Sequence, residues 1–139
     1  MDPCIFCSII EGDIPSHSIY EDKDTMAFLD VNPISPGHTL VIPKHHCSKL
    51  NELPPQDVVS LTKTIHSLIG PIERALGANA TTIAFNNGIE AGQEVPHVHC
   101  HIIPRFPQDG GRSIHSLLEK PQPPLTKLST IAESIKNLM

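Results

Sequence analysis

The pattern of apolar and polar residues predicts three strands early in the chain. Residues 18–21 and 25–31 are short runs of strand-forming residues joined by the polar turn 22–24, which is typical of a β-hairpin. Proline, glycine and polar residues at 32–37 separate them from the β-branched run 38–43, which ends at a proline. We therefore expect a hairpin followed by a third strand.

The middle of the chain carries apolar residues at helical spacing. They extend over residues 56–76, and Gly77 follows where such a helix would end. Gly70-Pro71 lies inside this run and is expected to kink or split the helix, because proline removes an internal hydrogen bond. Two more strands are predicted, one at 81–86 and one within 95–105, on either side of a glycine-bearing loop.

A proline-rich stretch then precedes a predicted last helix at 126–138. The element order predicts an α+β fold with an antiparallel sheet of about five strands, one long helix and a C-terminal helix. The 139 residues fit a single domain, 1–139, which can bury enough apolar surface to fold alone.

The charge balance bears on the kind of partner. Against 15 Asp and Glu the chain has 10 Lys and Arg, a net charge of -5 that disfavours a nucleic acid polymer. A single nucleotide is still compatible, because backbone N–H groups and imidazoles can hold one phosphate. No basic leader and no run of about 20 apolar residues is visible, so we expect a cytoplasmic protein without a membrane partner.

The four cysteines are too sparse for a secreted disulfide scaffold, so metal binding or burial is favoured. Cys4 and Cys7 have half the ligand spacing of a zinc site, and tetrahedral zinc needs two further nitrogen or sulfur donors. A redox pair and two plain buried cysteines are the alternatives. Cys47 and Cys100 are expected to be buried as small hydrophobic residues.

Three histidines alternate with apolar residues in the predicted last strand. Strand periodicity places His97, His99 and His101 on one face and the intervening apolar residues on the other. A neutral imidazole, with an ordinary pKa of about 6.5, is a good nucleophile near pH 7, and its phosphorylated form can hydrolyse. The pattern indicates a two-step phosphoryl-type transfer with His99 as nucleophile and its neighbours orienting it or handling a proton. Exposure on a sheet edge is the alternative.

Seven other short segments accompany these histidines: Cys4-Ile5-Phe6-Cys7, Ile14-Pro15-Ser16, Tyr20-Glu21-Asp22, Ala27-Phe28-Leu29-Asp30, Pro36-Gly37-His38, Leu40-Val41-Ile42-Pro43-Lys44 and Ala91-Gly92-Gln93. Together they resemble the histidine triad (HIT) family of nucleotide hydrolases and transferases, in the zinc-binding branch with an N-terminal Cys-x-x-Cys. The resemblance covers residues 4–106 and implies a HIT-like fold, leaving 107–139 as a tail.

The resemblance implies roles for particular residues. His99 would attack an α-phosphorus and form a nucleotidyl-histidine intermediate that water resolves, and His101 would contact phosphate and leaving group. Asn86 would contact the ribose-phosphate side, Gln93 the leaving group or bridging atom, and His38 would brace the site.

A nucleotide pocket is also implied. Asp30 would accept hydrogen bonds from the ribose hydroxyls. Glycines in the loop would let backbone N–H groups approach phosphate oxygens. Eight further residues are expected to contact the nucleotide: Ile5, Phe6, Ile9, Ile14, Phe28, Val31, Gly92 and Val95. Several of them could equally be ordinary residues of the hydrophobic core.

The same resemblance implies a structural zinc held by Cys4, Cys7, His46 and His97, with the adjacent His45 as an alternative to His46. Such a metal would add on the order of 10 kcal/mol when it folds with the site. It would leave His99 and His101 free for catalysis.

The implied substrates are purine nucleoside phosphoramidates or related adenylyl compounds, and dinucleoside polyphosphates, and the implied assembly is a homodimer. Glu94 departs from some relatives, which have a hydroxyl residue there, and the tail contains no Trp. Two other functions stay open. One is a hydrolase with zinc held by His97, His99 and a third histidine elsewhere, in which the metal-bound water attacks. The other is a nucleotide sensor or interaction module with negligible turnover.

Overall fold

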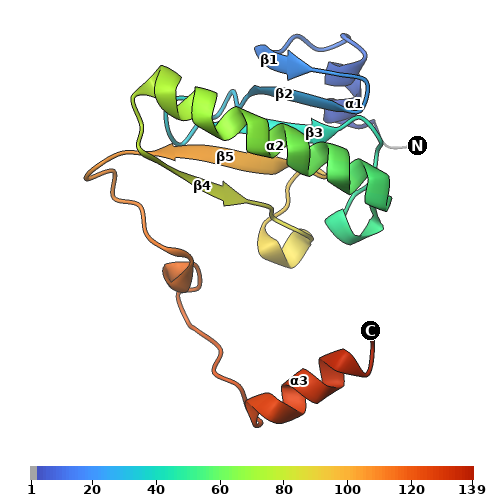
Figure 1. Cartoon of the computed structure of the whole chain (residues 1–139), viewed down its shortest axis with the longest axis vertical. Helices are drawn as coiled ribbons and strands as arrows, with labels where there is room; N and C mark the ends of the chain where they lie inside the picture. Colours follow the sequence, from blue (N-terminus) through green and yellow to red (C-terminus); the bar gives the residue numbers. More distant parts are fainter. Residues whose placement is uncertain (1–2) are drawn as a thin grey trace. The chain divides into compact units, whose positions relative to one another are not determined.

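The five predicted strands form one antiparallel sheet in the order β1-β2-β3-β5-β4, in a computed structural model that describes residues 3–139 (Figure 1). All four strand pairings are antiparallel, which confirms the α+β prediction. The strands are β1 (Ser18–Glu21), β2 (Thr25–Leu29), β3 (Thr39–Pro43), β4 (Ala80–Ala84) and β5 (Cys100–Arg105).

The main helix is α2 (Pro55–Leu76), which matches the predicted run and ends at Gly77 in the left-handed conformation, with φ of 67°. Pro71 does not split it, since the helix is continuous from end to end. Leu68 and Ile72, on either side of the Gly70-Pro71 step, are buried, and this packing holds the helix together where one backbone hydrogen bond is lost.

A short helix, α1 (Ile5–Ile10), was not predicted, because six residues are too few to establish a helical period. Cys4 caps it, since the backbone N–H of Cys7 donates to the Cys4 sulfur at 3.4 Å. The chain also contains three short 3-10 helices, η1 (Leu50–Glu52), η2 (Ile89–Ala91) and η3 (Ile114–Ser116), and a third α-helix, α3 (Leu128–Lys136).

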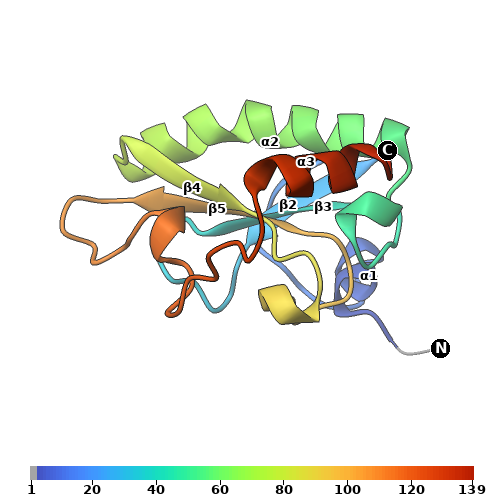
Figure 2. The ribbon, with the colours of Figure 1, turned by 90° about the horizontal axis from the view of Figure 1, so that it is seen from below.

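The two faces of the sheet are covered by different helices. Helix α2 lies along one face and α1 lies on the other, as the view in Figure 2 shows. Strand β3 is buried on both sides: Val41 belongs to the core cluster under α2, whereas Leu40 and Ile42 belong to the cluster with α1. Because α1 is short, the α1 side of the sheet leaves room for a site.

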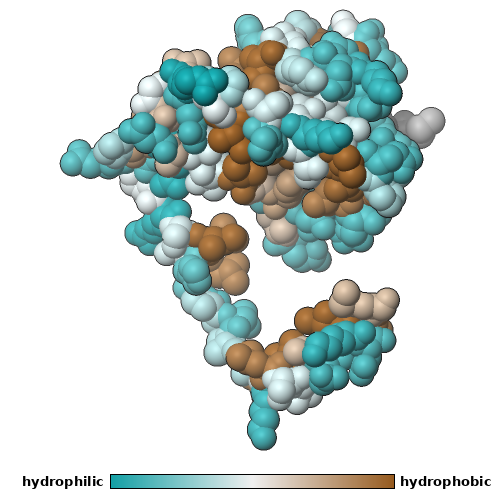
Figure 3. All heavy atoms as spheres, viewed as in Figure 1, coloured by the Kyte–Doolittle hydropathy of each residue, from teal (hydrophilic) through white to brown (hydrophobic). Residues whose placement is uncertain are grey.

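Of the described residues, 3–109 form one compact unit and 110–139 a second. The second unit contains η3 and α3, which lies within the predicted last helix. Its side chains are largely exposed, and apolar and polar surface lie side by side along α3 (Figure 3). Among residues 3–139, no helix has both the length and the apolar character that crossing a membrane requires.

Candidate functional site

The histidine segment enters the sheet later than its pattern predicts. Strand β5 starts at Cys100, so only His101 lies in the ladder, where it pairs with Leu40 and Ala84. The alternation nevertheless holds, since the three apolar residues between and after the histidines are buried in the core cluster under α2. This core fixes the histidines on the opposite side of the sheet.

His99 is held in one tautomer by the main chain. Its Nδ1–H donates to the carbonyl oxygen of His97 at 2.8 Å, which we assign because a carbonyl can only accept. The residue is 8% exposed, and its ring forms an edge-to-face contact with the Phe6 ring, with the centroids 5.1 Å apart. In the neutral ring the other nitrogen, Nε2, then carries the free lone pair that a nucleophile needs.

His101 is held in the opposite tautomer through His38. The N–H of Ile34 donates to His38 Nδ1 at 3.3 Å, so the proton of neutral His38 lies on Nε2. This Nε2–H donates to His101 Nδ1 at 2.9 Å, which leaves the proton of His101 on its own Nε2. That atom is buried and has no hydrogen-bond partner among residues 3–139. An unused buried donor beside a nucleophile suits a phosphate oxygen or a leaving group.

Burial favours the neutral forms of His101 and His38. It lowers the pKa of His101 to about 4, and the neighbouring His99 and His38 act in the same direction. Burial also lowers the pKa of His38, an effect that Asp30, 3.6 Å from His38 Nε2, partly opposes. At pH 7 His38 and His101 are therefore neutral rings, and the direction of the hydrogen bond between them is fixed.

Acid is expected to weaken the fold through His101. Between the ordinary pKa of 6.5 and the folded value of about 4, the unfolded chain binds a proton that the folded chain does not, so stability falls as the pH drops through this window. The full loss, reached below the folded pKa, is about 3–4 kcal/mol at about 1.4 kcal/mol per pKa unit. Urea unfolding of wild type and His101→Asn between pH 7.5 and 4.5 checks this, since the variant should show a flatter pH dependence. Identical slopes would contradict the assignment.

The histidines open into a cavity of about 440 Å³. One end is formed by apolar residues of the α1 side, among them Phe6, Ile9 and Phe28. The predicted nucleotide residues that line this cavity, together with His99 and His101, are Ile5, Phe6, Ile9, Ile14, Phe28, Asp30, Val31, Asn86, Gly92 and Val95. An apolar end joined to a polar, imidazole-lined end has the form of a small-molecule site.

Asp30 lines the same cavity. Its Oδ1 accepts from the N–H of Asn32 at 2.8 Å, which fixes the carboxylate just after β2 ends. The side chain faces the cavity and is partly exposed, so its oxygens can still accept hydrogen bonds from a ligand.

Gln93 does not line the cavity, and its side chain is engaged by the main chain. Its Oε1 accepts from the N–H of Gly88 at 2.8 Å, and its Nε2 donates to the carbonyls of Ser48 at 2.7 Å and Val95 at 3.0 Å. Gln93 thus ties the loop between β4 and β5 to the segment after β3. Its predicted contact with a leaving group stays a prediction.

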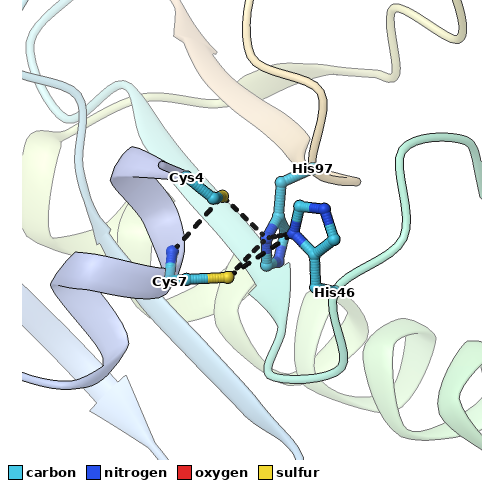
Figure 4. Close-up of side chains that lie close together, drawn as sticks. All are labelled: Cys4, Cys7, His46 and His97. Atoms are coloured by element: carbon cyan, nitrogen blue, oxygen red, sulfur yellow. Dashed lines mark hydrogen bonds between the residues drawn. The ribbon is translucent and has the colours of Figure 1, made fainter. Parts of the chain in front are cut away.

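Four potential metal ligands converge beside the histidine segment (Figure 4). The sulfur of Cys4 lies 3.4 Å from His97 Nδ1, and that of Cys7 lies 3.4 Å from His46 Nδ1. The two Nδ1 atoms are 3.1 Å apart. Zinc bond lengths in a tetrahedron give separations of about 3.5 Å for sulfur to nitrogen and about 3.3 Å for nitrogen to nitrogen. These residues can therefore hold a zinc ion without rearrangement.

The protonation of His97 also fits a ligand. Its Nε2–H donates to the carbonyl of Pro43 at 2.8 Å, so its Nδ1 bears a single lone pair. Three polar atoms surround that lone pair, which can accept only one hydrogen bond, whereas a metal ion satisfies all of them together. His45 instead pairs with Asp57 at 3.0 Å, so the structure favours His46 over His45.

Asp30, His38 and His101 form a second group of potential ligands that lie close together. Their protons are placed differently from those of the group that contains His97. His38 Nε2 carries a proton because its Nδ1 accepts from a backbone N–H, so this group forms a hydrogen-bond chain rather than a metal site. Within residues 3–139, no ligand group contains both His97 and His99, and this geometry gives no support to a zinc-bound nucleophilic water.

Comparison with known proteins matches residues 11–108 to the HIT domain family. The adenylylsulfatase of Arabidopsis thaliana is 42% identical over 106 residues, which are 76% of this chain and 54% of that protein. The adenosine 5'-monophosphoramidase of Schizosaccharomyces pombe is 40% identical over 111 residues, 80% of each chain.

Solved structures share the fold. A protein of Streptococcus mutans has a TM-score of 0.88 and 38% identity, covering 99% of this chain and 86% of its own. A zinc-bound histidine triad family protein of Mycobacterium smegmatis has a TM-score of 0.69 and 37% identity, covering 87% of this chain and 84% of its own.

Proposed function

The chain belongs to the HIT domain family, and from this premise we propose that it is a nucleotide hydrolase acting at the α-phosphate of purine nucleoside phosphoramidates or related adenylyl compounds. The observation that carries the proposal is the pair of fixed tautomers, with a free lone pair on His99 Nε2 and an unused proton on His101 Nε2. Relatives named as an adenosine 5'-monophosphoramidase and an adenylylsulfatase support the same reaction class.

The reaction proceeds in two displacements. His99 Nε2 forms a bond to the α-phosphorus while the bond to the leaving group breaks, and the leaving amine takes the electron pair and a proton from solvent water. The oxygen of a water molecule then bonds to phosphorus and gives up a proton to solvent, which restores the proton balance, and the bond between phosphorus and His99 Nε2 breaks. This step releases the nucleoside monophosphate and restores the lone pair on His99.

The other site residues bind and orient the nucleotide. His101 Nε2–H donates to an oxygen on which charge develops, a contribution that costs no reorganisation because His38 already fixes the ring. The apolar end of the cavity takes the purine, and Asp30 accepts from the ribose hydroxyls. Asn86 lines the same cavity, which supports a contact with the ribose-phosphate part of the nucleotide.

We propose that Cys4, Cys7, His46 and His97 hold a structural zinc ion, which is supported by their geometry and by the zinc-bound relative. When bound, the metal cross-links α1, the segment after β3 and the histidine segment. Four protein ligands complete a tetrahedron and leave no position for a reacting water. The homodimer and the cytoplasmic location stay predictions.

Turnover of adenosine 5'-phosphoramidate, followed by chromatography of the nucleotide products, tests this function. We expect release of adenosine monophosphate and ammonia at rates far above the uncatalysed reaction. Guanosine and cytidine phosphoramidates as parallel substrates test the purine preference. Nucleotide binding without product would contradict the proposed enzyme and leave a nucleotide-binding module.

A further inference from the structure

His99 lies on a segment that precedes the sheet. Strand β5 begins at Cys100, so residues 95–99 reach the site before the ladder of main-chain hydrogen bonds starts. The ring of His99 is oriented by the carbonyl of His97, which accepts from His99 Nδ1–H at 2.8 Å. The position of that carbonyl therefore decides where His99 Nε2 points.

Two main-chain hydrogen bonds anchor this segment. The N–H of Val98 donates to the carbonyl of Cys47 at 2.8 Å, which ties the segment to the chain that follows β3. The N–H of His97 donates to the carbonyl of Val95, also at 2.8 Å. A shift of the Val95 carbonyl would thus be passed on to His97, and through the carbonyl of His97 to the ring of the nucleophile.

The side-chain amide of Gln93 holds the Val95 carbonyl in place. Its Nε2 donates to the carbonyls of Val95 at 3.0 Å and Ser48 at 2.7 Å, and its Oε1 accepts from the N–H of Gly88 at 2.8 Å. These partners assign the amide oxygen and nitrogen, because a carbonyl can only accept. Both hydrogens of Nε2 are used, so the amide has no N–H left for a leaving group.

We propose that Gln93 is a positioning residue for the His99 nucleophile, which joins Val95 to the segment after β3 and acts on the reaction through the main chain without touching the substrate. This inference rests on the proposed function. A displacement of about 1 Å in a reacting group can cost about 10²-fold in rate, so a bond that fixes the segment can matter as much as a direct contact. The resemblance implies the other role, a contact with the leaving group, and the two roles predict different kinetics.

Gln93→Met keeps the length of the side chain and removes all three hydrogen bonds. In single-turnover rapid-quench experiments, adenylylation of His99 should slow by about 10²-fold for the adenosine phosphoramidates of ammonia, propylamine and aniline, with the three losses within about 3-fold of one another. Hydrolysis of the adenylyl-His99 intermediate, which contains no amine, should slow as well. A contact with the leaving group predicts instead that the losses differ among the amines and that hydrolysis keeps its rate.

The nitrogen NMR shifts of the His99 ring give a second readout, because they report which nitrogen carries the proton. Wild type should show the Nδ1–H form, and Gln93→Met a mixture of both tautomers. Gln93→Glu keeps the acceptor for Gly88 and loses only the two donors, so it serves where Gln93→Met does not fold. It should show the same loss for all three amines.

Asn87→Ala is the matched control, because the side-chain amide of Asn87 ties the same loop to the same region. Its Oδ1 accepts from the N–H of Leu50 at 2.8 Å and its Nδ2 donates to Asn51 at 3.3 Å, and neither bond reaches residues 95–99. This variant should keep the wild-type tautomer and rates within about 3-fold of wild type.

Three results would overturn the inference and leave the proposed function intact: losses that differ among the amines by more than about 3-fold, wild-type rates in Gln93→Met, or an equal loss in Asn87→Ala. The last of these would show that any loosening of the loop has the same effect. No turnover of the three compounds by wild type would instead count against the proposed function.

Discussion

Replacing His99 with alanine is expected to lower kcat/KM for adenosine phosphoramidate by about 10⁴-fold or more, because the variant has no nucleophile for the first displacement. The residual rate would come from binding and from the His101 donor alone. Mass spectrometry should detect an adenylyl adduct on His99 in quenched wild-type reactions, and none in the variant. The loss should appear in kcat, since the apolar end of the cavity and Asp30 still bind the nucleotide.

His66→Ala is a suitable control, because His66 is exposed on α2, and it should leave the rate within about 2-fold of wild type. Thermal unfolding of both variants checks that each is folded. A His99→Ala enzyme that keeps a tenth of the wild-type rate would contradict the nucleophile assignment. Turnover that depends on metal and forms no adduct would instead favour a zinc-bound water.

Removing the metal is expected to have the largest effect on stability. Cys7→Ser, or chelation of the wild-type protein, should lower the free energy of unfolding by several kcal/mol, because a structural zinc site supplies about 10 kcal/mol against a typical total of about 5–15. The four ligands come from α1, from the segment after β3 and from the segment before β5, so their loss frees three parts of the chain together.

Elemental analysis should find one zinc per wild-type chain and much less in Cys7→Ser, and denaturant unfolding of both proteins measures the difference in stability. Cys47→Ser is the matched control, because Cys47 lies outside the ligand group and donates weakly to the Glu52 carbonyl. It should retain the metal and most of the stability. Equal unfolding midpoints for Cys7→Ser and wild type would rule out a structural role for the metal.

The sequence predicted the sheet and the histidine face well, because both follow from periodicity. Alternation along residues 97–102 identified the buried row that anchors the segment, and helical spacing identified α2 to within one residue at each end. Helix α1 was not predicted, because it is about one and a half turns long and because its N-terminal cap is a cysteine, which is not among the residues preferred at that position.

The tautomers could not be predicted in the same way. They are set by the carbonyls of His97 and Pro43 and by the N–H of Ile34, and main-chain groups have no sequence signature. The clamp formed by Gln93 depends equally on backbone atoms from a distant segment. His38 was expected only as a brace, and its position between a backbone donor and His101 becomes visible in three dimensions alone.

His97 has two separate roles. Its main-chain carbonyl accepts the hydrogen bond that orients His99, whereas its side chain belongs to the group of potential metal ligands. Since every amino acid carries that carbonyl, the side chain at position 97 can change in the course of evolution without removing the acceptor that orients the nucleophile. A lineage can thus lose the Cys-x-x-Cys clip, replace it with apolar packing and keep its chemistry. Stability and reactivity can diverge independently at a single position.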